Sequence, residues 1–155
     1  MSKLVIYTDG ASKGNPGDAG IGVVIASEDG TVLKEIAEYV GTATNNFAEY
    51  TALIRGLEEA TNLGATEVQI STDSQLMAFQ LTGVYKVKSA NLKPLHEEAV
   101  SLLRCFKRVS ISHVVRELNK RADELANKGV KKKRRAEGGE PRARKRTPKQ
   151  GEMEF

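Results

Sequence analysis

The hydrophobic positions along this 155-residue chain follow two periodicities, and together they predict nine elements of secondary structure. Short apolar runs typical of strands alternate with longer segments in which apolar residues recur every three or four positions, the period of a helix. The pattern predicts strands at residues 3–8, 20–26, 31–41, 68–72 and 109–115, and helices at residues 46–63, 75–81, 91–106 and 120–128. The order β-β-β-α-β-α-α-β-α predicts an α/β fold, a five-stranded mixed sheet flanked by helices.

The connections between these elements carry their own signals. Glu28, Asp29 and Gly30 are typical of a hairpin turn, so the first three strands are expected to form an antiparallel meander. Residues 8–20 combine glycines with short polar residues, which predicts a turn that begins with Asp9 at the end of the first strand. On its own this stretch fits a simple hairpin turn as well as a functional site. Gly129 is expected to end the last helix.

Charge divides the chain into two parts. Residues 130–155 hold 10 Lys/Arg and 4 acids, a formal charge of +6, whereas residues 1–129 hold 14 Lys/Arg and 16 acids, a charge of −2. The basic part has almost no apolar residues, so it cannot bury enough surface to offset the entropy of ordering. We therefore expect one folded domain at residues 1–129 and a basic, disordered tail at residues 130–155.

Composition also indicates the cellular compartment and the oligomeric state. No apolar run approaches the roughly 20 residues that cross a bilayer, and the N-terminus lacks a signal-peptide pattern. The single cysteine, Cys105, excludes an internal disulfide framework and fits a reducing compartment. No long apolar stripe suggests a dimer. We expect a cytoplasmic monomer that does not bind membranes.

Four acids are expected to meet at one edge of the sheet: Asp9, Glu49, Asp73 and Asp123. Each has a simpler explanation, as a turn residue, a helix N-terminal acid, an N-cap or a solvated helix acid. Four carboxylates that converge repel one another unless cations lie between them. Carboxylate oxygens suit Mg²⁺, with Mn²⁺ as the alternative. Two such ions about 3.5–4 Å apart can activate a water and stabilise the leaving oxygen of a phosphodiester.

Four motifs, TDGASKGNPG, TNNFAEYTAL, STDSQ and RADELANKG, occur in this order and resemble those of ribonuclease HI over residues 2–129. The resemblance implies a ribonuclease H-like fold and an Mg²⁺-dependent endonuclease. Such an enzyme cuts the RNA strand of RNA–DNA hybrids, leaves 3′-hydroxyl and 5′-phosphate ends, and removes RNA primers and R-loops. The resemblance further implies that the four acids are catalytic metal ligands. Asp9 would bridge the two ions, and Asp123 would help to hold the ion that carries the attacking water.

The same resemblance implies contacts with the hybrid, whose RNA strand is distinguished from DNA by its 2′-hydroxyl groups. The matching residues are Ser12, Gly14, Asn15, Asn45 and Gln75, with Thr44 on a DNA phosphate. Plain helix capping explains Thr44 and Asn45 equally well, and the two roles are compatible.

The chain also departs from a well-known type of the family. It has no basic protrusion after the helix at residues 75–81, only a short loop with Lys86 and Lys88. It has no room for the family's loop histidine before the last acid, so we expect His113 to pack in its strand and Arg116 to face the substrate. The first strand starts at Lys3, so no preceding hybrid-binding domain is expected. The pattern is closer to compact archaeal or bacterial variants.

Basic residues outside the acid cluster are expected to bind phosphates without sequence preference. They are Lys86, Lys88, Lys131, Lys132, Lys133, Arg134 and Arg135. The folded part is mildly acidic, so it repels a polyanion. The basic tail would add affinity, because each phosphate that it neutralises releases a bound counterion. An inert tail or a nuclear-targeting signal is the alternative.

Two other functions remain open at this stage. The chain could be a non-catalytic RNA- or hybrid-binding module, which the presence of all four acids disfavours. It could also be a nuclease of the same fold that acts on double-stranded RNA or on DNA structures. The implied 2′-hydroxyl contacts argue against the DNA option but not against RNA.

Overall fold

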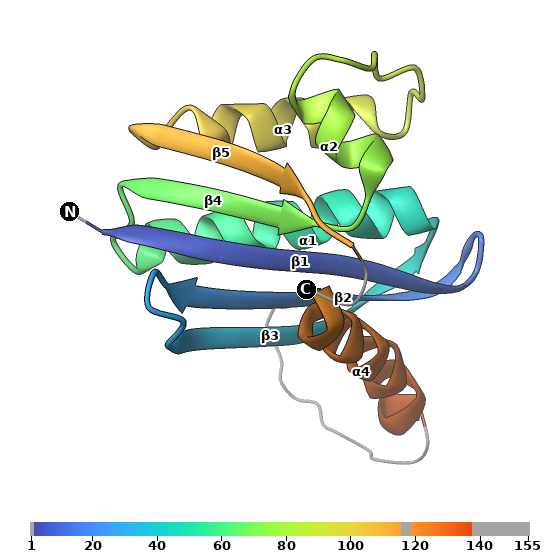
Figure 1. Cartoon of the computed structure of the whole chain (residues 1–155). Helices are drawn as coiled ribbons and strands as arrows, with labels where there is room; N and C mark the ends of the chain where they lie inside the picture. The colour runs from blue at the N-terminus through green and yellow to red at the C-terminus, as the bar shows by residue number, and fades with distance from the viewer. Residues whose placement is uncertain (1, 116–118, 138–155) are drawn as a thin grey trace.

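The computed structural model describes residues 2–115 and 119–137, and it contains the nine predicted elements in the predicted order (Figure 1). The strands are β1 Lys3–Gly14, β2 Gly17–Ser27, β3 Val32–Ala43, β4 Glu67–Thr72 and β5 Arg108–His113. The helices are α1 Asn45–Asn62, α2 Gln75–Leu81, α3 Lys93–Leu103 and α4 Lys120–Glu137. The prediction of an α/β fold with a five-stranded mixed sheet is confirmed.

The strands lie in the order β3-β2-β1-β4-β5, with β1 at the centre of the sheet. The predicted meander is confirmed, because β1, β2 and β3 pair antiparallel in sequence order. The strands that arrive through helices, β4 and β5, pair parallel to β1 and β4 respectively. The carboxyl end of β4, at Thr72, therefore lies beside Thr8 of β1.

Helices cover both faces of this sheet. Figure 1 shows α1 behind the sheet and α4 in front of β2 and β3, and α3 packs against α1. The core between the sheet and α1 includes the fully buried side chains of Ile6, Val23, Ile70, Leu53 and Leu57. Each such side chain stabilises the fold by roughly 2 kcal/mol relative to an exposed one, so this face is what holds α1 in place.

The predicted turn at residues 8–20 is wrong in extent. β1 continues to Gly14 and β2 begins at Gly17, so only Asn15 and Pro16, joined by a cis peptide bond, form the turn. Strand pairing runs without interruption from Asp9↔Gly22 to Gly14↔Gly17. The polar, glycine-rich sequence did not signal a strand, because this pairing comes from the partner strand rather than from side-chain pattern.

The predicted end of α4 at Gly129 is also wrong. The helix continues to Glu137, so residues 131–137, which the sequence placed in the tail, are helical. A Cβ on Gly129 would lie 2.4 Å from the carbonyl oxygen of Glu38. The glycine therefore permits α4 to pack closely on β3 and does not end the helix. Residues 138–155 lie outside the described part of the chain, and the division at residue 130 stays a prediction.

Local signals elsewhere behave as expected, with one exception. Gly30 adopts a positive φ of 91° in the predicted β2–β3 turn, and its N–H donates to the Ser27 carbonyl at 3.0 Å. Thr44 is the N-cap of α1. His113, which we expected to pack, is exposed at the end of β5. Among the helices described, none is both long and apolar enough to span a membrane.

Candidate active site

Two parallel strands carry the first two carboxylates of the site. Thr8 of β1 pairs with Thr72 of β4, and Asp9 and Asp73 are the next residues along the two strands. The register therefore brings the two acids together at the sheet edge, as the sequence predicted. Asp9 lies within β1 rather than at its end, because the strand continues to Gly14.

Glu49 joins them because Gly10 lets α1 approach β1. A Cβ on Gly10 would lie 2.5 Å from the carbonyl carbon of Ala48 and 2.6 Å from the nitrogen of Glu49. No side chain fits there, so the start of the helix rests directly on the strand. One carboxylate oxygen from each of Asp9, Glu49 and Asp73 then lies within 4.8 Å of the other two. Such a group could hold a metal ion.

Asp123 reaches the cluster from the first turn of α4. This helix crosses β2 at Gly22, where a Cβ would lie 2.0 Å from the carbonyl oxygen of Ala122 and 2.5 Å from the nitrogen of Ala126. The close crossing brings the Asp123 carboxyl into hydrogen-bond contact with Asp9. The four predicted carboxylates thus line one cavity of about 490 Å³.

Burial and crowding keep the ionised forms unfavourable in the protein alone. The pKa of Asp9 is raised from 3.8 to about 8, first by burial, then by the hydrogen bond with Asp123 and by repulsion from Asp73. The pKa of Glu49 is raised well above its ordinary value by burial and by repulsion from Asp9 and Asp73. Desolvation and like charges both favour the protonated carboxylic acid.

Two oxygens of the cluster have no partner within the described part of the chain: Glu49 Oε1 and Asp73 Oδ2 are buried and accept no hydrogen bond. An unpaired buried carboxylate oxygen is costly. A bound divalent cation would satisfy these oxygens and offset the repulsion among the acids, and an all-oxygen donor set suits a hard ion. The residues present therefore fit a metal ion.

The β1–β2 hairpin lies against the start of α1 and forms a polar wall beside the acids. The hydroxyl of Ser12 shares its single proton between the carbonyl oxygens of Gly14 and Ala43, the latter at 2.8 Å. The side-chain oxygen of Asn15 accepts from the backbone N–H of Asn45 at 2.9 Å. Ser12 and Asn45 line the acid cavity itself, so the hairpin tip and α1 are held together next to the carboxylates.

The remaining predicted contact residues lie farther apart. Thr44 accepts from the N–H of Phe47 at 3.2 Å as the N-cap of α1 and lines a neighbouring cavity with Pro16 and Asn91. Gln75 is exposed at the first position of α2. Arg116 lies outside the described residues.

The predicted basic residues fall in two places. Lys86 and Lys88 are exposed in the loop between α2 and α3 and line a further cavity there. Lys131 and Lys132 are exposed on α4, and Lys132 donates to the carbonyl oxygen of Ala37. The backbone of the next three predicted residues, Lys133, Arg134 and Arg135, belongs to α4.

Comparison with known proteins identifies the family. A family model described as "Reverse transcriptase-like" matches residues 7–129. A ribonuclease H of Pseudomonas savastanoi is 36% identical to this chain over 139 residues, which cover 81% of this chain and 91% of that protein. This chain belongs to the ribonuclease H family.

The solved structure of LC11-RNase H1 in complex with an RNA/DNA hybrid superposes on this ribonuclease H with a TM-score of 0.80. The two are 44% identical over 84% of this chain and 98% of that one. The bifunctional protein Rv2228c of Mycobacterium tuberculosis is 47% identical over 126 residues, 81% of this chain but 35% of that protein. The ribonuclease H chain thus spans about a third of the length of the mycobacterial relatives it matches.

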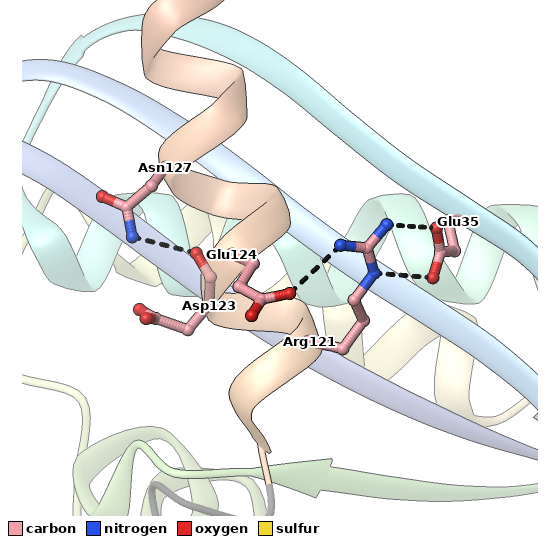
Figure 2. Close-up of polar contacts among 5 residues, drawn as sticks. All are labelled: Glu35, Arg121, Asp123, Glu124 and Asn127. Carbon is pink, nitrogen blue, oxygen red and sulfur yellow. Dashed lines mark hydrogen bonds and ion pairs between the residues drawn. The ribbon is translucent and has the colours of Figure 1, made fainter.

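The predicted site residues leave out two polar residues that line the acid cavity, Ser74, which is the N-cap of α2, and Asn127. Asn127 lines the acid cavity, and its side-chain N–H donates to the Asp123 carbonyl oxygen at 2.9 Å (Figure 2). It lies four residues after Asp123, so helical spacing alone places both on one face of α4. That spacing was the available signal.

Proposed function

We propose that this ribonuclease H hydrolyses the RNA strand of RNA–DNA hybrids, leaving 3′-hydroxyl and 5′-phosphate ends. The observation that carries the proposal is the cluster of Asp9, Glu49 and Asp73, two of which have buried unpartnered oxygens. Asp123 and the polar wall of Ser12 and Asn45 line the same cavity. The similar LC11-RNase H1 has been solved with an RNA/DNA hybrid. Removal of RNA primers and R-loops is the cellular role that this activity serves.

In the proposed mechanism, Asp9, Glu49, Asp73 and Asp123 would hold two Mg²⁺ ions, or Mn²⁺ in their place. When bound, these ions lower the pKa of an attacking water and stabilise the leaving oxygen. Asp9 is central because it touches Asp123 and Glu49 and faces Asp73, so it would be the ligand shared between ions. Asp123 would help to hold the ion that carries the attacking water.

The residues of the polar wall would align the hybrid. The Ser12 hydroxyl donates to backbone in the protein alone, which leaves its lone pairs free to accept from a ribose 2′-hydroxyl. Asn15, Asn45 and Gln75 would offer further donors and acceptors to the RNA strand. Gly14, with φ of 105°, would allow the backbone to come close to the ribose.

Phosphate contacts would come from the surroundings of this wall. Thr44 would bind a phosphate of the DNA strand, and Arg116 would face the substrate. Lys86 and Lys88, with the basic residues of α4, would add contacts independent of sequence. The single cysteine fits a reducing compartment, and we propose that the protein acts in the cytoplasm as a monomer.

One assay separates this function from its alternatives. End-labelled RNA–DNA hybrid, double-stranded RNA and double-stranded DNA are incubated with Mg²⁺ and either the wild-type protein or Asp73→Asn. We expect cleavage of the hybrid RNA strand by the wild type and its loss in Asp73→Asn, because one oxygen of the cluster is replaced by an amide. Binding without cleavage would support a non-catalytic module, and equal cleavage of double-stranded RNA would support a broader nuclease.

Salt dependence tests the basic surface of α4. Replacing Lys131 and Lys132 with glutamine is expected to reduce the slope of log affinity against log salt by about 1–2, because each neutralised phosphate contributes close to one unit. The turnover number should stay unchanged, because these residues lie at least about 12 Å along the helix from Asp123. Filter binding of hybrid between low and moderate salt measures the slope.

The matched control replaces Lys107 and Arg108, which are exposed at the start of β5, the end of the strand opposite the carboxylates. This control should leave the slope unchanged. Equal slopes in the wild type and the Lys131/Lys132 variant would contradict a role of these lysines in hybrid binding. The basic segment would then be inert or a targeting signal.

A further inference from the structure

Asp123 occupies a part of α4 that needs external support. It lies in the first turn of the helix, where backbone N–H groups lack intrahelical partners and helices fray. Asn119, immediately before the helix, is buried and donates from its side-chain nitrogen to the Thr8 carbonyl at 2.8 Å. This bond attaches the helix start to β1 next to Asp9, and the buried side chain of Ala122 packs the inner side of the same turn against the sheet.

A second attachment lies on the other side of the same turn. Arg121 Nε donates to Glu35 Oε2 at 2.9 Å, and Nη2 donates to Glu35 Oε1 at 2.8 Å, while Nη1 donates to Glu124 at 3.1 Å (Figure 2). Glu35 belongs to β3, the edge strand of the sheet. A two-pronged guanidinium–carboxylate pair fixes orientation as well as distance.

The helix geometry links this pair to the active site. Successive residues of an α-helix are rotated by about 100°, so Arg121 and Asp123 project about 200° apart, on nearly opposite sides of α4. Any rotation of the first turn that opens the Arg121–Glu35 pair therefore swings Asp123 away from Asp9. Removing the pair should cost little global stability, because solvent-exposed ion pairs contribute little to it.

We infer that Arg121, through its paired contact with Glu35, is a positioning residue that holds Asp123 in place for metal binding. The inference rests on the proposed function, since it assigns Asp123 as a metal ligand. Arg121 itself is not among the residues that line the acid cavity. Its effect is expected on metal affinity, with little effect on folding or on hybrid affinity.

The test compares Mg²⁺ binding in wild-type protein and Arg121→Ala by titration calorimetry, together with the Mg²⁺ dependence of hybrid cleavage. We expect the Mg²⁺ dissociation constant and the half-maximal Mg²⁺ concentration to rise about tenfold, the range typical when a group that orients a metal ligand is lost. KM for the hybrid at saturating Mg²⁺ should change less than about twofold.

The chain offers a matched control. Arg55 of α1 also connects a helix to β3, through Glu38 at 3.4 Å, and also pairs with a glutamate of its own helix, Glu59 at 3.3 Å. Arg55→Ala removes an equivalent ion-pair cluster on the α1 face of the sheet. It should lower the unfolding temperature as much as Arg121→Ala does and leave Mg²⁺ binding unchanged.

Glu35→Gln distinguishes loss of the Arg121–Glu35 contact from a direct effect of the Arg121 charge on Mg²⁺ binding. Loss of a nearby positive charge at residue 121 would by itself tighten Mg²⁺ binding, and loss of a negative charge at residue 35 would weaken it. Positioning instead predicts weaker binding in both single variants and no further loss in the double variant, because both break one contact.

Three results would overturn the inference: tighter or unchanged Mg²⁺ binding in Arg121→Ala, additive losses in the double variant, or an equal loss in Arg55→Ala. Calorimetry measures these without catalysis. A wild-type protein that binds Mg²⁺ but does not cleave the hybrid would contradict the proposed function. The comparison of Mg²⁺ affinities between the wild type and Arg121→Ala would still be valid.

Discussion

Asp9→Asn is expected to lower the rate of hybrid cleavage by about a thousandfold or more, the scale seen when one member of a concerted catalytic group is removed. Asp9 is the acid that contacts or faces all three others, so its replacement would disturb both metal positions at once. Asparagine keeps the size of the side chain but removes its charge. Cleavage of end-labelled hybrid at saturating Mg²⁺ measures the loss.

The same variant is expected to be more stable than the wild type at pH 8 without metal. The pKa of Asp9 is about 8 in the folded protein against 3.8 ordinarily, so the folded state holds a proton that the unfolded state has released. Stability contributed by this group is therefore complete below about pH 4, falls as pH rises, and is lost by about pH 8. Asparagine does not ionise, so the variant should lose this part of the pH dependence and gain a few kcal/mol at pH 8.

Urea unfolding at pH 5 and pH 8 in the presence of a chelator measures this effect. Glu97→Gln, at an exposed position of α3, is the control and should change neither cleavage nor the pH dependence. Cleavage by Asp9→Asn at more than about a tenth of the wild-type rate would contradict a central role of Asp9. Equal stability of the two proteins at pH 8 would contradict its raised pKa.

Gly22→Ala is expected to lower the free energy of unfolding by about 3 kcal/mol and to abolish most cleavage. The new methyl group would lie 2.0 Å from the carbonyl oxygen of Ala122 and 2.5 Å from the nitrogen of Ala126. Backbone atoms of a helix cannot move aside individually, so α4 must shift away from β2. Because Asp123 lies between these two contacts in sequence, the shift would also separate it from Asp9.

Gly83→Ala is the control for this substitution. Gly83 has a φ of +85°, and a Cβ at this position would have no atom of the described chain within 4 Å, so alanine there costs only backbone strain, about 1 kcal/mol. Urea unfolding and hybrid cleavage are measured for both variants. If Gly22→Ala were no less stable than Gly83→Ala, close packing of α4 on β2 would not be what positions Asp123.

Most of the fold could be predicted because its signals are local. Apolar periodicity identified all nine elements, and their order implied a five-stranded mixed sheet. The same reasoning placed Asp9 and Asp73 at one edge. The length of the hairpin at residues 8–20 was predicted wrongly. Its strand residues, such as Ser12 and Gly14, show no apolar pattern, and the two strands are extended because they pair with each other.

Glycines were the other source of error. Gly129 is typical of a helix terminator in sequence, since glycine commonly follows the last turn. In the structure it lies within α4 against Glu38. A glycine used for close approach and a glycine used to end a helix look the same in a sequence, because the difference lies in a neighbour that is distant along the chain.

Local periodicity and motifs were enough to predict the order of the elements, to single out the four acids and to recognise the family that they resemble. How the acids meet depends on the packing of helices on the sheet. Gly10 and Gly22 admit α1 and α4 to the sheet, burial raises the pKa of Asp9, and the Arg121–Glu35 pair orients the first turn of α4. Each of these depends on distances between residues far apart in the chain, which no local pattern encodes.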